Sequence, residues 1–135
     1  MRLAKILTQP LLLILCIALI SCDDNNDQSN DRIENTIAYV TSVNAPNSGP
    51  LNVPMSIEVQ FGVINGCDRF EKFIEMENGN SRTIEVEAKY VGSVCTQNAP
   101  ILTTNYEFTV FNTGNYELNF KSSPTEYITI NILLN

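Results

Sequence analysis

Several residue types on which enzymes and nucleic-acid-binding proteins rely are absent or scarce. The 135 residues include no histidine and no tryptophan, and charged residues make up only 17%. Without histidine, the chain lacks the commonest general base and the commonest metal ligand. Eight basic residues face fifteen acidic ones, whereas nucleic-acid binding requires clustered Lys and Arg. The composition therefore argues against a nucleic-acid binder. The 44% of hydrophobic residues is typical of a single small globular domain.

Catalytic motifs are also missing. A Ser–His–Asp triad is impossible without histidine, and neither a Gly-x-Ser-x-Gly motif nor a phosphate-binding glycine pattern occurs. The carboxylate pairs Glu85/Glu87 and Glu107/Glu117 resemble glycosidase pairs in type, but a solvated sheet face explains them better. The acidic residues 23–31 lack the glycine and final glutamate of an EF-hand. We therefore expect no enzyme, no catalytic residue, no metal and no cofactor.

The first 21 residues have the features of an export signal. Arg2 and Lys5 precede an apolar run, residues 11–20, that is too short to span a bilayer. The run ends in Leu19-Ile20-Ser21-Cys22, which resembles the lipobox of bacterial lipoproteins. The resemblance implies that residues 1–21 are removed and that Cys22 carries a diacylglyceryl group and an amide-linked fatty acid such as palmitate. Two or more acyl chains anchor a protein stably in the bilayer. A plain signal peptide with an incidental cysteine is the alternative.

The segment after Cys22 predicts a flexible tether, which we place at residues 22–35. Residues 23–31 contain four acidic residues, no basic one and no aliphatic one, so they cannot form a core. Such a stretch resembles the signal that sends some Gram-negative lipoproteins to the outer leaflet. It implies an outer-membrane lipoprotein at the cell surface, or alternatively a spacer at the periplasmic face. Removal of Arg2 and Lys5 leaves six basic residues against fifteen acidic ones, a net charge of −9.

The remaining cysteines predict one disulfide. Cys16 leaves with the signal peptide and Cys22 is lipidated, so only Cys67 and Cys95 remain in an oxidising compartment. The absence of a Cys-x-x-Cys motif and of histidine argues against a reactive thiol. We expect a Cys67–Cys95 bridge.

Residues 36–135 read as a domain of β-strands. Apolar and polar residues alternate with a period of two, which predicts strands with one buried face. Turn residues such as Asn, Gly and Pro separate the strands. The alternation places strands at residues 36–40, 53–63, 84–90, 106–110, 116–121 and 127–132. A strand over residues 68–76 is favoured over a two-turn helix, because the hairpin signal at Asn78-Gly79 needs a first strand. About seven strands predict an antiparallel sandwich.

The segment 112–118 resembles the tyrosine corner of immunoglobulin-like domains, in which a tyrosine hydroxyl bonds to the backbone upstream. The resemblance gives this role to Tyr116, at the start of the strand called F in that class. Leu118 stands where antibody domains have their second cysteine, and the core tryptophan is absent. The likeness is therefore to the broad bacterial Ig-like class, and it implies a fold rather than a ligand.

These features predict a non-catalytic binding or structural module that recognises a protein or a glycan through a sheet face or end loops. The alternative is a protease inhibitor, with residues 44–54 and 91–100 as its loops, or an accessory subunit of a surface complex. Phe111 and Phe73 fall out of phase with their neighbours, so either one is a candidate for an exposed binding patch.

Overall fold

Every regular element in the described part of the chain is a β-strand. The computed structural model describes residues 32–92 and 94–135, so Cys22, the lipobox and the acidic residues 23–31 lie outside the described residues. The strands are β1 (Arg32–Asn44), β2 (Ser48–Gly49), β3 (Met55–Gly62), β4 (Asp68–Asn78), β5 (Ser81–Gly92), β6 (Ile101–Phe108), β7 (Gly114–Lys121) and β8 (Tyr127–Leu134).

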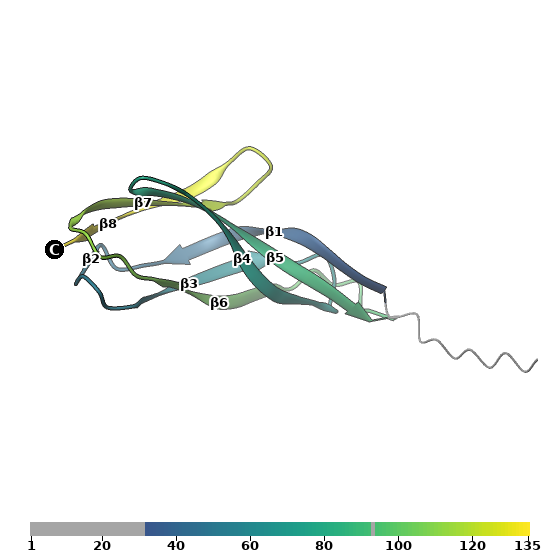
Figure 1. The fold of residues 1–135 in the computed structure, drawn as a ribbon. Coiled ribbons are helices and arrows are strands. Elements are labelled where there is room, and N and C mark those ends of the chain that lie inside the picture. Colours follow the sequence, from purple (N-terminus) through teal and green to yellow (C-terminus); the bar gives the residue numbers. More distant parts are fainter. Residues whose placement is uncertain (1–31, 93) are drawn as a thin grey trace, which may run out of the picture.

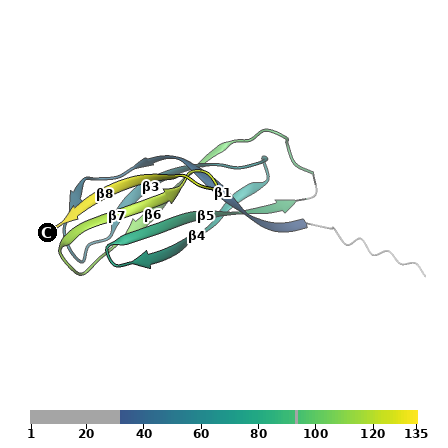
Figure 2. The same cartoon turned by 90° about the horizontal axis from the view of Figure 1, so that it is seen from above.

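The strands form one curled, mixed sheet with the shape of a half-barrel (Figures 1 and 2). Their order is β2-β8-β7-β5-β1-β3-β6, and β4 pairs with β5 as well. Strand β1 belongs to both halves, because its first part pairs with β5 and its last part pairs with β3. The register shifts between Val40 and Ser42, where the strand bends from one half to the other.

The alternation of the sequence decides which face each strand buries. In β3, Met55, Ile57, Val59 and Phe61 are buried, and the residues between them are exposed or half-buried. Each fully buried large side chain contributes roughly 1.5–3 kcal/mol. The other core residues are Ala38, Val40, Val63, Ile84, Val86, Ala88, Tyr106, Phe108, Val110, Tyr116, Leu118, Phe120, Ile132 and Leu134.

Residues 68–76 form a strand, as the hairpin signal predicted. Strand β4 contains one extra residue, Glu71, because its register with β5 shifts between Phe70 and Lys72. The bulge places both Phe70 and Phe73 opposite buried residues of β5. It therefore explains why these two phenylalanines are out of phase in a strict two-residue pattern. Gly79 begins the turn to β5 with φ 60°, the conformation that glycine adopts most readily.

The prediction of a wholly antiparallel sheet was wrong. Strands β5 and β7 are parallel, from Ser81 opposite Glu117 to Ile84 opposite Phe120, and the short β2 is parallel to β8. After β5 the chain crosses to the other half as β6 and returns as β7, so β7 has the same direction as β5. Alternation along one strand reports its buried face and carries no information on the direction of its neighbour.

The domain also begins earlier than predicted. Strand β1 starts at Arg32 rather than at residue 36, and Arg32 to Asn35 pair with Gly92 to Lys89 of β5. These residues lack a clear apolar alternation, so only the backbone pairing places them in the sheet. The eighth strand, β2, lies in a segment that the sequence predicted to be a turn.

The two ends of the molecule carry different loops. The proximal end contains Arg32 and the loops at residues 63–67 and 94–100, and the distal end contains the loops at residues 45–54, 79–80 and 109–113. The C-terminus lies at the distal end, opposite the start of β1 (Figure 1).

Candidate functional site

Two loops at the distal end, joined by a backbone hydrogen bond, each carry an exposed apolar side chain. We call residues 50–54 and 109–113 the distal tip. The backbone N–H of Asn52 donates to the carbonyl of Val110 at 3.0 Å, so Val53 and Phe111 each follow a bonded residue. Phe111 is 74% exposed and Val53 is 48% exposed. Phe111 comes after the end of β6, which leaves it outside the buried set of that strand.

Phe73, the other out-of-phase phenylalanine, belongs to the interior. Its ring lies 4.9 Å from that of Phe70 and 5.1 Å from that of Tyr106, centroid to centroid, and it packs against the core. Of the two sequence candidates, therefore, only Phe111 contributes to an exposed patch.

Tyr116 supports the base of the distal tip. Its hydroxyl donates to the carbonyl of Asn112 at 3.1 Å, and its buried ring lies edge-on to Phe108 at 5.8 Å. Gly114 lies between Asn112 and Tyr116 in the sequence and has φ 153°. A Cβ at this position would lie 3.0 Å from the side-chain amide of Asn80. The loop that presents Phe111 is thus tied to the core by a side chain and by a close backbone approach.

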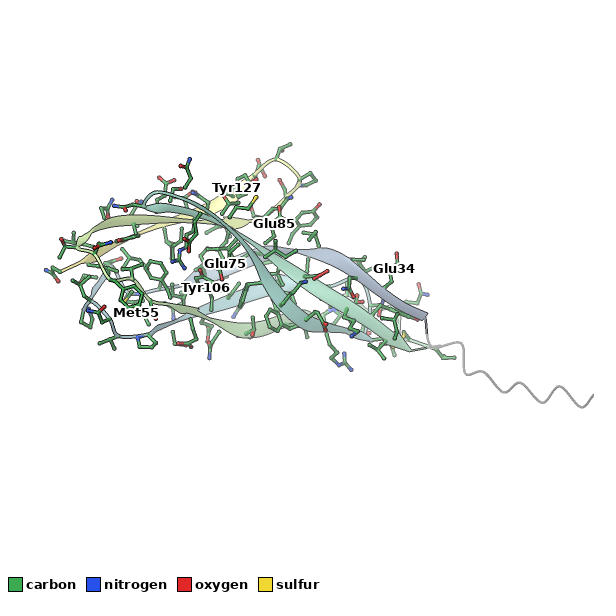
Figure 3. All side chains as sticks on the ribbon, viewed as in Figure 1. Glu34, Met55, Glu75, Glu85, Tyr106 and Tyr127 are labelled. Carbon is green, nitrogen blue, oxygen red and sulfur yellow. A yellow bond between two sulfur atoms is a disulfide. The ribbon has the colours of Figure 1, made fainter. Side chains whose placement is uncertain are left out.

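A polar cluster lies between the two halves of the sheet, at Glu75, Arg82 and Tyr106 (Figure 3 labels Glu75 and Tyr106). The Tyr106 hydroxyl donates to Glu75 Oε2 at 2.7 Å, and Arg82 Nη1 donates to the Tyr106 oxygen at 3.2 Å. Arg82 Nη2 pairs with Glu77 Oε1 at 2.7 Å. The guanidinium also lies 5.0 Å from the centre of the Phe108 ring.

The electrostatics of this cluster suit a structural cross-link. Burial raises the pKa of Tyr106 well above 10, the hydrogen bond to Glu75 raises it further, and the bond from Arg82 opposes the rise. Burial alone lowers the pKa of Arg82, but Tyr106, Glu77 and Glu75 outweigh it and the pKa is raised. A neutral tyrosine and a charged arginine at physiological pH hold β4, β5 and β6 together and are poorly matched to proton transfer.

The two-residue alternation of the sequence did not predict this cluster. Without a bulge, Glu75 reads as an outward residue of β4, whereas it lies opposite the buried Ile84. The phase shift between Phe70 and Phe73 was the one signal that could have revealed the bulge.

At the proximal end, Cys67 and Cys95 form the predicted disulfide, with their Cα atoms 5.5 Å apart. The bridge joins the 63–67 loop to the 94–100 loop, and the Tyr90 hydroxyl donates to Cys95 Sγ at 3.3 Å. A shallow hollow of about 250 Å³ lies beside the bridge, between Glu34, Tyr90 and the buried Asp68.

The residues around this hollow stabilise the loops. The Asp68 carboxylate accepts from the backbone N–H groups of Ile64 and Asn65, at 3.0 and 3.2 Å. Two backbone bonds, Val63 to Pro100 and Gly66 to Thr96, fasten one loop along the other. The 94–100 segment, within one of the two predicted inhibitor loops, is therefore held against the domain.

The outward carboxylates divide into two kinds. Glu107 and Glu117 are exposed, in agreement with a solvated face. Glu85 and Glu87 also point outward but are half-buried: Glu85 pairs with Lys121 at 2.6 Å and Glu87 with Lys72 at 3.2 Å.

Residues 32–92 and 94–135 contain neither a cluster of metal ligands nor a membrane-spanning helix. In that part of the chain, no group of three or more Cys, Asp or Glu side chains is placed to hold a metal ion. No helix there is long and apolar enough to cross a membrane.

Comparison with known proteins identifies the domain but no individual relative. No curated protein and no solved structure matches the chain. Residues 57–130, from β3 into β8, match the family model of the ORF11 beta-sandwich domain. Because this match covers more than half of the chain and the strands form a two-sided β-structure around one core, the protein belongs to the ORF11 beta-sandwich domain family.

Proposed function

We propose that this protein is a lipid-anchored, surface-displayed outer-membrane lipoprotein whose β-sandwich is a non-catalytic binding module. The observation that carries the proposal is the exposure of Phe111 and Val53 on two hydrogen-bonded loops at the end of the molecule opposite Arg32. A lipid on Cys22 would hold the proximal end toward the membrane. Residues 23–31 would then allow a separation of up to about 30 Å when extended.

The distal tip has the properties of a contact surface. Contiguous exposed apolar patches mark interaction sites, and aromatic residues are enriched among the residues that dominate the energy of protein interfaces. The loop with Phe111 is held by the Tyr116 bond and by the Asn52–Val110 bond, so it loses little entropy on binding. The favoured partner is a protein with an apolar pocket.

We also propose that the fold is immunoglobulin-like. An Ig-like ancestry is supported by the Tyr116–Asn112 bond, which lies where the chain passes from β6 in one half to β7 in the other. The position of β5, between β4 and β7 and parallel to β7, departs from the antiparallel sheets of immunoglobulin domains.

Photocrosslinking in cells tests the distal tip. A photoreactive residue replaces Phe111 in the full chain, and the matched control replaces Ile64, which is 70% exposed at the proximal end. We expect one discrete adduct from position 111 that disappears when Val53→Ser is added, and no such adduct from position 64. Equal adducts at both positions, or none at 111, would contradict the proposal. The adduct also separates the alternatives, because a protease would indicate an inhibitor and a membrane complex an accessory subunit.

Substitution of Cys22 tests the anchor. Cys22→Ser should abolish the incorporation of labelled palmitate and leave an uncut or soluble form, because the thiol is the acceptor of the diacylglyceryl group that the lipobox resemblance implies. Membrane fractionation after an alkaline wash is the measurement. A Cys22→Ser protein that stays in the membrane pellet would show that the apolar run itself acts as a membrane span.

A further inference from the structure

Strand β5 changes its neighbour halfway along its length, and this creates a fork in the sheet. From Ser81 to Ile84 it pairs with β7, and from Val86 onward the same edge pairs with β1. Glu85 lies at the point of change, opposite neither strand. Beyond it, β7 turns away through residues 122–126 into β8. We call this point, with the outward side chains around it, the fork.

Four outward side chains surround the fork. Lys121 Nζ lies 2.6 Å from Glu85 Oε1, and these side chains are only 19% and 17% exposed although they lie on the outer face. Tyr127 is directly opposite Lys121 on β8, and Tyr39 follows Ala38, the first β1 residue paired beyond the fork. Figure 3 shows Glu85 and Tyr127 together beside the β7–β8 hairpin.

The two tyrosines lie close enough to act on the same cation. The hydrogen bond to Glu85 raises the pKa of Lys121 against the effect of desolvation, and both Tyr127 and Tyr39 add to the rise. Tyr127 is 45% exposed and Tyr39 is 38% exposed. A recessed ion pair, with partly exposed tyrosines on the neighbouring strands β8 and β1, therefore faces solvent at this point.

The surface beside the fork consists of amide, hydroxyl and carboxylate groups. Thr129 Oγ1 donates to Asn119 Oδ1 at 2.5 Å, and Asn119 Nδ2 donates to Glu117 Oε1 at 2.8 Å and to Ser81 Oγ at 3.3 Å. These groups come from β5, β7 and β8, and their mutual bonds fix their orientation. Ordered donors and acceptors of this kind set the orientation of a bound polar molecule.

We propose that the fork binds a neutral oligosaccharide. A sugar ring has hydroxyl groups around its edge that both donate and accept hydrogen bonds, and C–H faces that pack on aromatic rings. Glu85, Lys121 and Asn119 match the hydroxyl groups, and Tyr127 and Tyr39 match the faces. The Lys121–Glu85 pair carries no net charge, and the excess of acidic residues in the chain disfavours an anionic glycan. The site is separate from the distal tip, so it goes beyond the proposed function.

Calorimetry with the mature lipidated chain in a zwitterionic detergent tests this proposal, since a sugar-based detergent would compete. The probes are maltohexaose, cellohexaose, laminarihexaose, mannohexaose and xylohexaose. We expect one of them to bind with a dissociation constant below about 1 mM, which corresponds to roughly −4 kcal/mol. Tyr127→Ala and Tyr39→Ala should each weaken binding about tenfold, whereas Tyr127→Phe, which keeps the ring, should bind as the wild type does.

The matched control is Phe111→Ala, which removes an exposed aromatic ring at the distal tip and should leave sugar binding unchanged. Backbone chemical-shift changes in the wild-type chain provide a measurement that needs no variant, and they should centre on residues 85, 121 and 127. The proposal is overturned if no hexasaccharide binds, if the tyrosine variants bind as tightly as the wild type, or if the shifts centre on residue 111. Because the crosslinking at position 111 is read independently, failure here leaves the distal tip proposal intact.

Discussion

At the residue scale, two buried tyrosines support the domain in different ways. Tyr116 bonds a loop carbonyl four residues upstream, and its contribution is local to the distal tip. Tyr106 joins strands β4, β5 and β6 through Glu75 and Arg82. Both rings also fill the core, so a change to phenylalanine isolates the hydroxyl from the packing.

Tyr116→Phe should lower the free energy of unfolding by roughly 0.5–1.5 kcal/mol, the net contribution of one hydrogen bond. Tyr116→Ala should cost about 3–5 kcal/mol, because it also leaves a cavity. Urea titration at constant slope measures both. Tyr127→Phe, with a partly exposed ring, is the control and should change little. Equal and negligible losses of stability at both positions would show that Tyr116 does not act as a tyrosine corner.

Tyr106 should make the domain sensitive to alkali. Burial raises the pKa of Tyr106 in the folded protein above its value in the unfolded chain. The neutral Tyr106 hydroxyl therefore contributes its full stabilisation below about pH 10, and this contribution is lost as the pH rises above that value. Urea midpoints measured from pH 8 to pH 12 should fall more steeply for the wild type than for Tyr106→Phe. The pKa of Lys121 is also raised, and its deprotonation at high pH lowers the stability of both proteins equally. Parallel declines would show that Tyr106 ionises as readily in the fold as outside it.

At the scale of single elements, departures from regular geometry position the side chains. The bulge at Glu71 turns Phe73 toward the core and Glu75 toward the Tyr106 hydroxyl, and the tight turn at Gly79 brings β5 back along β4. Without the bulge, the face of β4 toward the core would carry Lys72 in place of Phe73. The polar cluster and the aromatic contact between Phe73 and Tyr106 both depend on this one extra residue.

A comparison of two glycines tests the backbone conformation of the turn separately from steric contacts. A Cβ at Gly79 or at Gly62 would meet no atom within 4 Å, but only Gly79 has a positive φ. Gly79→Ala should therefore cost about 1–2 kcal/mol through backbone strain. Gly62→Ala in extended β3 should be neutral or slightly stabilising. Thermal and urea unfolding of the two variants provide the comparison, and equal losses would contradict a role for the φ angle.

At the scale of the whole molecule, the disulfide holds together two loops that both run between the halves of the half-barrel. The 63–67 loop follows β3 and precedes β4, and the 94–100 loop lies between β5 and β6, so each loop crosses from one half to the other. Because the disulfide joins loops at the proximal end only, it does not constrain the distal loops. This division suits a module with a stable base and a contact surface at its far end.

Removal of the bridge should therefore lower global stability. The double variant Cys67→Ala/Cys95→Ala should lose roughly 3–4 kcal/mol, given a sequence separation of 28 residues. The wild type in reducing agent serves as the control and should show the same urea midpoint. A midpoint that does not move would mean that the backbone bonds between the loops, such as Gly66 to Thr96, are sufficient by themselves.

The local pattern of the sequence determined the strands, their buried faces and the disulfide. Alternation reports which side of a strand is apolar, and the two cysteines within residues 36–135 have one way to pair with each other. Phe111 could be identified as a candidate for the same reason, because its position contradicts the period of β6.

Only the tertiary structure decided which strands are neighbours and in which direction they run. The parallel pair β5–β7 exists because β6 lies between them in the chain and in the opposite half of the fold. The fork at Glu85 and the Arg82 cluster follow from that arrangement, since each brings together side chains from strands distant in sequence. A two-residue period is a property of one strand, whereas a site built from three strands depends on the path of the whole chain.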